Sequence, residues 1–223
     1  GANAEFGRSG GGFVNVLTRS GTNELRGTAH LYGKSDALSS DYARGGGNPD
    51  FSQGQFGFTL GGPLRRDRAF FFMALDHQQF EQTKQTDPGR IGDPRLRAFM
   101  DTAFGGVLAN DYGPISRTND ATAFLAKLDY RLSAAHQASI KYNYTHSRQE
   151  NGTFDVDAWA RSSNGLERDF SHAVNGSLTS LLSNSVSNEF RFQLSREDRP
   201  RDYTGPNVPG TDHPFPDTGM EFV

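Results

Sequence analysis

Apolar and polar residues alternate with a period of two along most of the chain, which is the pattern of β-strands with one apolar face. Ala138, Ile140, Tyr142 and Tyr144, for example, alternate with serine, lysine, asparagine and threonine. Segments with this pattern are expected to form seven strands, at residues 25–34, 51–61, 68–80, 120–131, 137–148, 168–180 and 186–197. Each is longer than the usual globular strand of about 5–6 residues and reaches the about 9–11 residues that a tilted strand needs to cross a bilayer.

The connections between these segments alternate between long and short. The long ones are residues 35–50, 81–119 and 149–167, and the short ones are residues 62–67, 132–136 and 181–185. A β-sandwich has no reason to sort its loops in this way, whereas a barrel of the outer membrane has short periplasmic turns and long extracellular loops. The sequence therefore predicts an all-β fold, a partial transmembrane antiparallel β-barrel of about seven up-and-down strands. Its first strand would run toward the exterior.

The two faces of such strands would meet different surroundings, lipid on one side and a wet lumen on the other. The residues expected on the lipid side are Leu60, Phe71, Met73, Leu128, Ile140, Leu178 and Phe192. Those expected on the lumen side are Lys127, Asp129, Lys141 and Arg191. Aromatic residues near strand ends are typical of the girdles at the membrane surfaces, and the candidates are Phe80, Tyr130, Tyr142, Tyr144 and Phe170.

One helix is expected inside the loop at 81–119. Asp93 can cap its start and Pro94 suits its first turn, and Gly105 can end it. Its apolar stripe is Leu96, Phe99, Met100 and Ala103. Such a stripe usually packs, so we expect the helix to lie against the loop or the barrel rim.

Composition narrows the function classes. The 223 residues are 34% hydrophobic, carry a net charge of −3 and include no cysteine. The longest purely apolar run is Ala69–Leu75, whereas a transmembrane helix needs about 20 residues. The net charge is slightly negative, so the composition gives no sign of the positively charged surface that binds nucleic acid. The lack of cysteine excludes disulfides and thiolate metal sites within these residues.

No pattern of catalytic residues stands out, so we predict that the protein is not an enzyme. The glycine-rich residues 7–12 lack the lysine of a phosphate-binding loop, and no zinc-protease or serine-hydrolase motif occurs. The sequence indicates no catalytic, cofactor-binding or metal-binding residue, no cofactor, and no identifiable ligand. Ligand selectivity would lie in the long loops, whose exposed candidates are Asp41, Tyr42, Arg44, Arg90, Arg95, Asp111, Tyr112, Asp157, Trp159 and Arg161.

Several blocks of the sequence resemble a known family. They are Ala4–Asn23 (AEFGRSGGGFVNVLTRSGTN), Phe58–Leu64 (FTLGGPL), Asp67–Phe72 (DRAFFF), Phe124–Ser133 (FLAKLDYRLS) and Asn188–Phe192 (NEFRF). The first resembles the end of the plug in TonB-dependent outer-membrane receptors. Together the blocks are most similar to the Oar-like branch, whose members often carry a carboxypeptidase-regulatory-like domain.

This resemblance implies a plug inside a barrel of about 22 strands, which imports a ligand with energy from TonB. Residues 1–23 would then be the C-terminal end of the plug domain and its linker, with the last plug strand at 12–18 and the link at 19–23. Residues 24–223 would be the N-terminal part of the barrel. The implied location is the outer membrane of a Gram-negative bacterium. The implied partners are outer-membrane lipid, an extracellular ligand and the TonB complex, which would bind an N-terminal part that this chain lacks.

Two other functions stay open from the sequence. One is a structural or adhesive outer-membrane barrel without energised transport, although the plug-like segment at residues 4–23 favours transport. The other is a soluble β-sandwich that binds glycans, against which strand length and loop alternation both count. If the barrel interpretation is right, this chain alone should form a curved open sheet. Its two bare edges would lie at residues 25–34 and 186–197.

Overall fold

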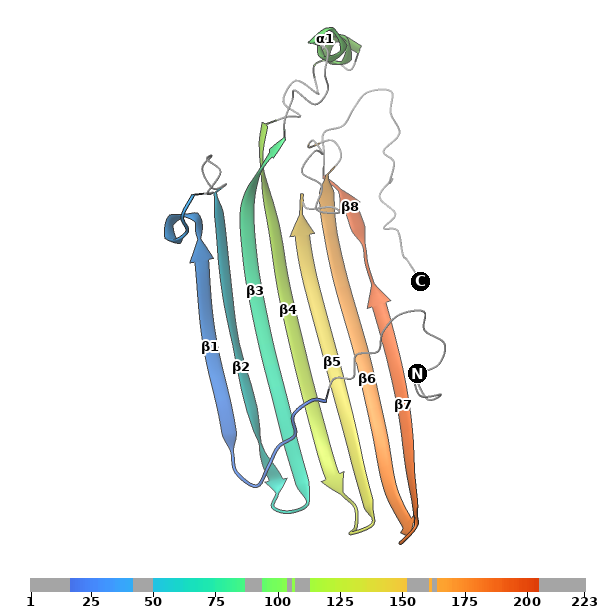
Figure 1. Ribbon diagram of the computed structural model, residues 1–223. Helices are drawn as coiled ribbons and strands as arrows, with labels where there is room; N and C mark the ends of the chain where they lie inside the picture. Colours follow the sequence, from blue (N-terminus) through green and yellow to red (C-terminus); the bar gives the residue numbers. More distant parts are fainter. Residues whose placement is uncertain are drawn as a thin grey trace.

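A single antiparallel sheet dominates the computed structural model, which describes residues 17–41, 50–86, 94–103, 106, 113–151, 161 and 164–204 (Figure 1). Its strands are β1 (Arg26–Ser35), β2 (Phe51–Arg65), β3 (Ala69–Thr86), β4 (Gly113–Arg131), β5 (His136–Glu150), β6 (Gly165–Ser183), β7 (Val186–Asp198) and the short β8 (Arg201–Tyr203). The described helices are a 3-10 turn, η2 (Asp36–Leu38), and one α-helix, α1 (Pro94–Ala103).

Strands β1 to β7 pair in sequence order, each antiparallel to its neighbour, which confirms the predicted meander. The three tight connections lie at one end of the sheet and the long connections, including α1, at the other (Figure 1). The alternation of short turns and long loops is therefore a property of the fold. The sheet is curved and open: β1 lies at one edge and β7 at the other, as expected.

Several strands are longer than the sequence predicted. The pairing of β3 with β4 continues out to Thr86 and Gly113, through residues assigned to the loop at 81–119. Apart from Ile115, these outer ends are mostly polar on both faces, so they carry no clear period-two signal. Backbone hydrogen bonds extend the ladder there. Side chains add to them: Ser116 Oγ donates to Glu81 Oε1 at 2.9 Å, and Arg117 donates to Gln82 Oε1 at 3.0 Å.

The eighth strand, β8, was not expected. It pairs with β6 in the same register as β7: Asp198 lies opposite Phe170, and Arg201 lies opposite Glu167. Pro200, which has no N–H to donate, separates the two, and its carbonyl still accepts a hydrogen bond from Arg168 N at 3.0 Å. Strand β8 is thus the outer end of β7, interrupted at a proline.

Helix α1 begins at Pro94, as predicted, and ends at Ala103. Gly106 beyond it has a left-handed backbone (φ 75°), and its N–H donates to the carbonyl of Asp101. The expected cap Asp93 and terminator Gly105 lie outside the described residues. Phe99 is 66% exposed, so the packing expected for this side chain is not seen.

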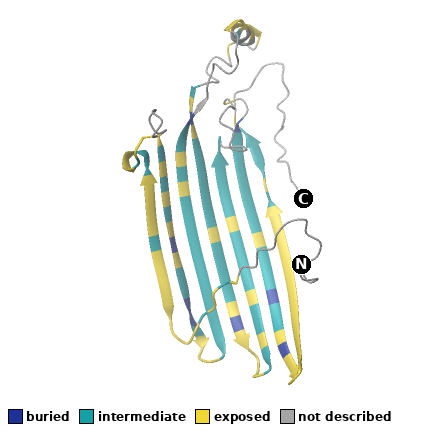
Figure 2. Ribbon diagram, viewed as in Figure 1, coloured by how far each residue is buried: buried dark blue, intermediate teal, exposed yellow. Residues whose placement is uncertain are grey.

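The sheet has almost no conventional core. Among the described residues, Ile115 is the one buried apolar side chain, and most strand residues are exposed or half-buried (Figure 2). Leu31 is 81% exposed and Leu194 is 70% exposed. A soluble protein rarely exposes an apolar surface of this extent. These side chains are therefore expected to contact an apolar medium or a binding partner, not water. No helix in the described part of the chain is both long and apolar enough to span a membrane.

Candidate functional site

The strand register sorts the side chains onto two chemically different faces. Residues directly opposite one another in an antiparallel pair point to the same side. The register joins Leu60, Met73, Ala126, Tyr142, Val174 and Leu194 in one row across β2 to β7. Alternation along each strand then places every residue predicted for the lipid side on this apolar face, and Lys127, Asp129, Lys141 and Arg191 on the opposite, polar face. The predicted grouping is confirmed, except that Phe80, a girdle candidate, lies on the polar face, opposite Gln53.

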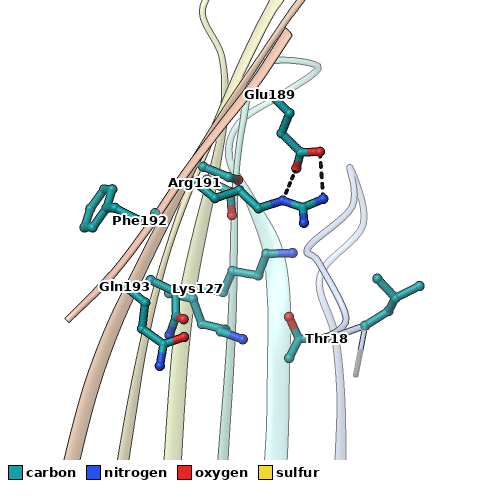
Figure 3. A pocket seen from close by; sticks show the side chains of 12 residues that line it. Thr18, Lys127, Glu189, Arg191, Phe192 and Gln193 are labelled. Atoms are coloured by element: carbon teal, nitrogen blue, oxygen red, sulfur yellow. Dashed lines mark hydrogen bonds and ion pairs between the residues drawn. The ribbon is translucent and has the colours of Figure 1, made fainter. Parts of the chain in front are cut away.

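The polar face carries a cavity of about 590 Å³. It is lined by Leu17 and Thr18 and by residues of β4 to β7, among them Lys127, Ser139, Lys141, Asn175, Glu189, Arg191 and Gln193 (Figure 3). Most of these groups are polar or charged. The cavity is therefore suited to water, to a polar polypeptide segment or to a polar solute, and unsuited to lipid.

Charged groups in and next to this cavity form ion pairs with one another. Glu189 accepts two hydrogen bonds from Arg191, both of 2.7 Å. Lys127 Nζ lies 3.5 Å from Asp129 Oδ1, and both side chains are largely buried. Lys141 lies opposite Lys127 in the β4–β5 register. Two like charges face each other there, and the nearby carboxylate offsets their repulsion.

Residues 17–23, which we call the linker, run across the polar face toward the start of β1 (Figure 1). Ser20 Oγ accepts a hydrogen bond of 2.8 Å from Lys127 Nζ. Asn23 pairs reciprocally with Asp67 in the β2–β3 turn: its Nδ2 donates to Oδ1 at 2.6 Å, and its Oδ1 accepts from the Asp67 N–H at 2.8 Å. A Cβ on Gly21 would lie 2.2 Å from the carbonyl oxygen of Phe71. The linker is thus fixed to the sheet by the side chains of Ser20 and Asn23 and by the close backbone contact of Gly21 between them.

A double-mutant cycle tests this attachment. The variants Asn23→Ala and Asp67→Ala in the intact protein should each lower the free energy of unfolding. Because each removes the same side-chain pairing, their effects should couple by about 0.5–1.5 kcal/mol. Urea unfolding in lipid vesicles measures both. Asp36, at the loop end of the sheet, provides the control: the effects of Asn23→Ala and Asp36→Ala on the free energy of unfolding should be additive. Additive effects of Asn23→Ala and Asp67→Ala would contradict the attachment.

A second polar network crosses three strands of the polar face. His30 Nε2 on β1 lies 2.9 Å from Asp76 Oδ2 on β3, and Gln55 on β2 donates to Asp76 Oδ1 at 2.9 Å. His30 and Asp76 meet because the residue between them in the register is Gly57. A Cβ there would lie 2.6 Å from the imidazole and 2.8 Å from the carboxylate.

The variant Gly57→Ala should therefore destabilise the sheet by about 1–3 kcal/mol, the usual cost of overpacking. The matched control is Gly54→Ala on the same strand, where a Cβ would meet nothing within 4 Å. That change should alter stability by less than about 0.5 kcal/mol. Equal effects of the two substitutions on urea unfolding would show that the network does not require the glycine.

Ion pairs gather where β6 to β8 approach the long loops. Arg199 Nε lies 2.9 Å from Asp169 Oδ2 and 2.6 Å from Glu197 Oε1. The hydrogen bond with Asp169 raises the pKa of Arg199 above its ordinary value, so this guanidinium stays charged. Arg201 pairs with Glu167 at 2.9 Å. These pairs stabilise the loop end of the sheet around Pro200.

Only three of the ten loop residues predicted as ligand-contact candidates lie among the described residues. Asp41 follows η2, Arg95 lies in the first turn of α1, and Arg161 donates to the carbonyl of Pro114 at 3.0 Å. All three are exposed, and they come from three separate segments of the chain. The remaining candidates lie outside the described residues: Tyr42, Arg44, Arg90, Asp111, Tyr112, Asp157 and Trp159. In the described part of the chain, histidine and acidic residues form no group that could hold a metal ion.

Comparison with known proteins agrees with this architecture. The chain matches the family described as outer membrane beta barrel domain over residues 17–98 and 99–219. It is also similar to the TonB-dependent transporter Oar of Myxococcus xanthus, with 30% identity over 156 residues. The match covers 63% of this chain and 14% of that protein, so the chain spans a small part of its relative's length. No solved structure matches the chain.

The family settles which medium each face meets. In an outer membrane barrel the apolar face contacts lipid and the polar face lines the lumen, which accounts for the exposed apolar side chains such as Leu31 and Leu194. Barrels and transporters of this kind are not enzymes, in agreement with the sequence prediction. The chain therefore belongs to the outer membrane beta-barrel domain family, which places it in the outer membrane of a Gram-negative bacterium.

Proposed function

We propose that this chain is part of a TonB-dependent receptor that binds a ligand at its extracellular loops and imports it through a plugged barrel. The observation that carries the proposal is the linker, which is held on the lumen face by Lys127 and at the β2–β3 turn by Asp67. A simple pore or adhesin has no need of a segment fixed inside its lumen. The similarity to a TonB-dependent transporter supports the same role.

The proposal includes the division of the chain that its sequence predicts. Residues 1–23 are the C-terminal end of a plug domain with its linker, and residues 24–223 are the N-terminal part of the barrel. The described part of the linker supports this division, because it crosses the lumen face and meets β1 at Arg26. The expected plug strand at 12–18 lies almost entirely outside the described residues.

Further strands are needed to complete the barrel. The outer edges of β1 and β7 have no strand partner among the described residues, and a lipid-exposed backbone must be paired. We propose that other strands of the receptor close the barrel between these two edges. The TonB complex would act on the plug, and the long loops at the α1 end of the sheet would contact the ligand.

Growth measurements can test the transport function while the ligand is still unidentified. Strains lacking the receptor gene, lacking TonB or lacking both would be grown on panels of single iron chelates, vitamins, glycans and peptides. A nutrient on which both single deletions fail equally, and the double deletion fails no further, identifies the import function. An adhesive barrel predicts a different outcome: loss of surface attachment in the receptor deletion alone, with no shared growth defect.

A further inference from the structure

On β5 to β7, the lipid face becomes more polar near the loops. The row that contains Tyr142, Val174 and Leu194 is apolar, and the next row toward the loops contains Tyr144, His172 and Arg196. Arg196 is therefore the first charged residue above the apolar band on β7. In a tilted barrel strand, this is the level of the lipid headgroups.

Arg196 has no partner among the described residues. It is exposed, and its guanidinium makes no hydrogen bond or ion pair with any of them. The two other arginines on this face of β5 and β6 lie two register rows further toward the loops, and both are paired: Arg148 with Glu150 at 3.1 Å, and Arg168 with Asp202. Both carboxylates lie on the loop side of their arginines. Of these three arginines, Arg196 presents an uncompensated charge directly above lipid-facing leucine and phenylalanine.

His172 stands beside Arg196 in the register of β6 and β7. Its ring contacts Tyr144, with 5.0 Å between ring centroids, and its Nδ1 lies 2.8 Å from the Tyr142 hydroxyl. Its Nε2 has no hydrogen bond to a described residue. The tyrosines thus hold the imidazole in place and leave one ring nitrogen available next to the guanidinium.

We propose that Arg196, with His172 beside it, binds a phosphate on the headgroup of an outer-leaflet lipid. An arginine at the edge of the hydrocarbon layer needs an anion that shares its low-dielectric surroundings, and a lipid phosphate lies at this depth. Asp198, the next residue on the same face, lies further toward the loops and does not pair with Arg196. The binding site rests on the outer-membrane location and is independent of the proposed transport.

The test uses the complete receptor, because the strand that pairs with β7 borders the site. Lipopolysaccharide binding to the purified protein would be measured by native mass spectrometry. Arg196→Gln should weaken binding about fivefold, as expected for one arginine near a charged lipid surface, and His172→Gln should weaken it less. Removing the lipid's phosphates should weaken binding to the unaltered protein and have little effect on Arg196→Gln.

The control is Arg191→Gln, which removes the same charge from the same strand on its lumen face and should leave lipid binding unchanged. Heat-modifiable migration in gels verifies that every variant is folded. The proposal is overturned if Arg196→Gln binds like the unaltered protein, or if Arg191→Gln loses as much. It is also overturned if millimolar inorganic phosphate displaces the lipid, which would indicate a site for a soluble anion.

Discussion

Replacing Ile140 with arginine in the complete receptor is expected to destabilise the barrel by about 2–4 kcal/mol, the cost of a cation on the lipid face near the bilayer midplane. Ile140 is 48% exposed and lies between Leu128 and Gly176 in the register. No polar group in this row can receive the guanidinium. Urea unfolding in lipid vesicles gives the change in free energy, and gel migration after heating reports assembly.

The matched control is Asn143→Arg, three residues further along β5. Asn143 faces the lumen, where a charged side chain stays hydrated, so this substitution should cost less than about 1 kcal/mol. The comparison depends only on which face each residue occupies, since both positions share one strand. If the two variants unfolded alike, the assignment of the apolar face to lipid would be wrong.

The faces of the sheet could be predicted because a strand's side chains alternate strictly. Leu128 and Lys127 are neighbours on one strand, so their side chains lie on opposite faces of the sheet. Because paired residues share a face, the strand pairing then determines the face of every residue on the neighbouring strands. The same alternation indicated seven strands, and loop lengths indicated their order. These are the features that the sequence encodes locally, and the structure agrees with them except for the face of Phe80, the bounds of several strands and the additional strand β8.

Other features depend on contacts between distant residues and left no local signal. Asn23 pairs with Asp67, and His30 reaches Asp76 over Gly57. Neither pair has a motif, because the register that brings the partners together is set by the whole sheet. Strand β8 escaped prediction for another reason, since a proline such as Pro200 normally ends a strand, yet β8 continues in register beyond it.

The isolated chain, residues 1–223, should fail to form a closed barrel or a working transporter. Its sheet has two open edges, β1 and β7, whose backbone groups face outward without strand partners among the described residues. Every lipid-exposed backbone group must be paired, and barrels meet this requirement by closing. The apolar face adds a second difficulty in water, since Leu31, Phe190 and Leu194 are well over half exposed. Both features favour association with other chains through edges and faces.

Expression of residues 1–223 alone tests this expectation directly. Without detergent the chain should aggregate, as size-exclusion chromatography with light scattering would reveal. In planar lipid bilayers it should give no stable single-chain conductance, because a seven-stranded sheet with free edges cannot enclose a pore. A monodisperse soluble monomer, or a stable pore formed by one chain, would contradict the need for further strands. It would also remove the basis for a plugged transporter, since a small closed barrel leaves no lumen for a plug.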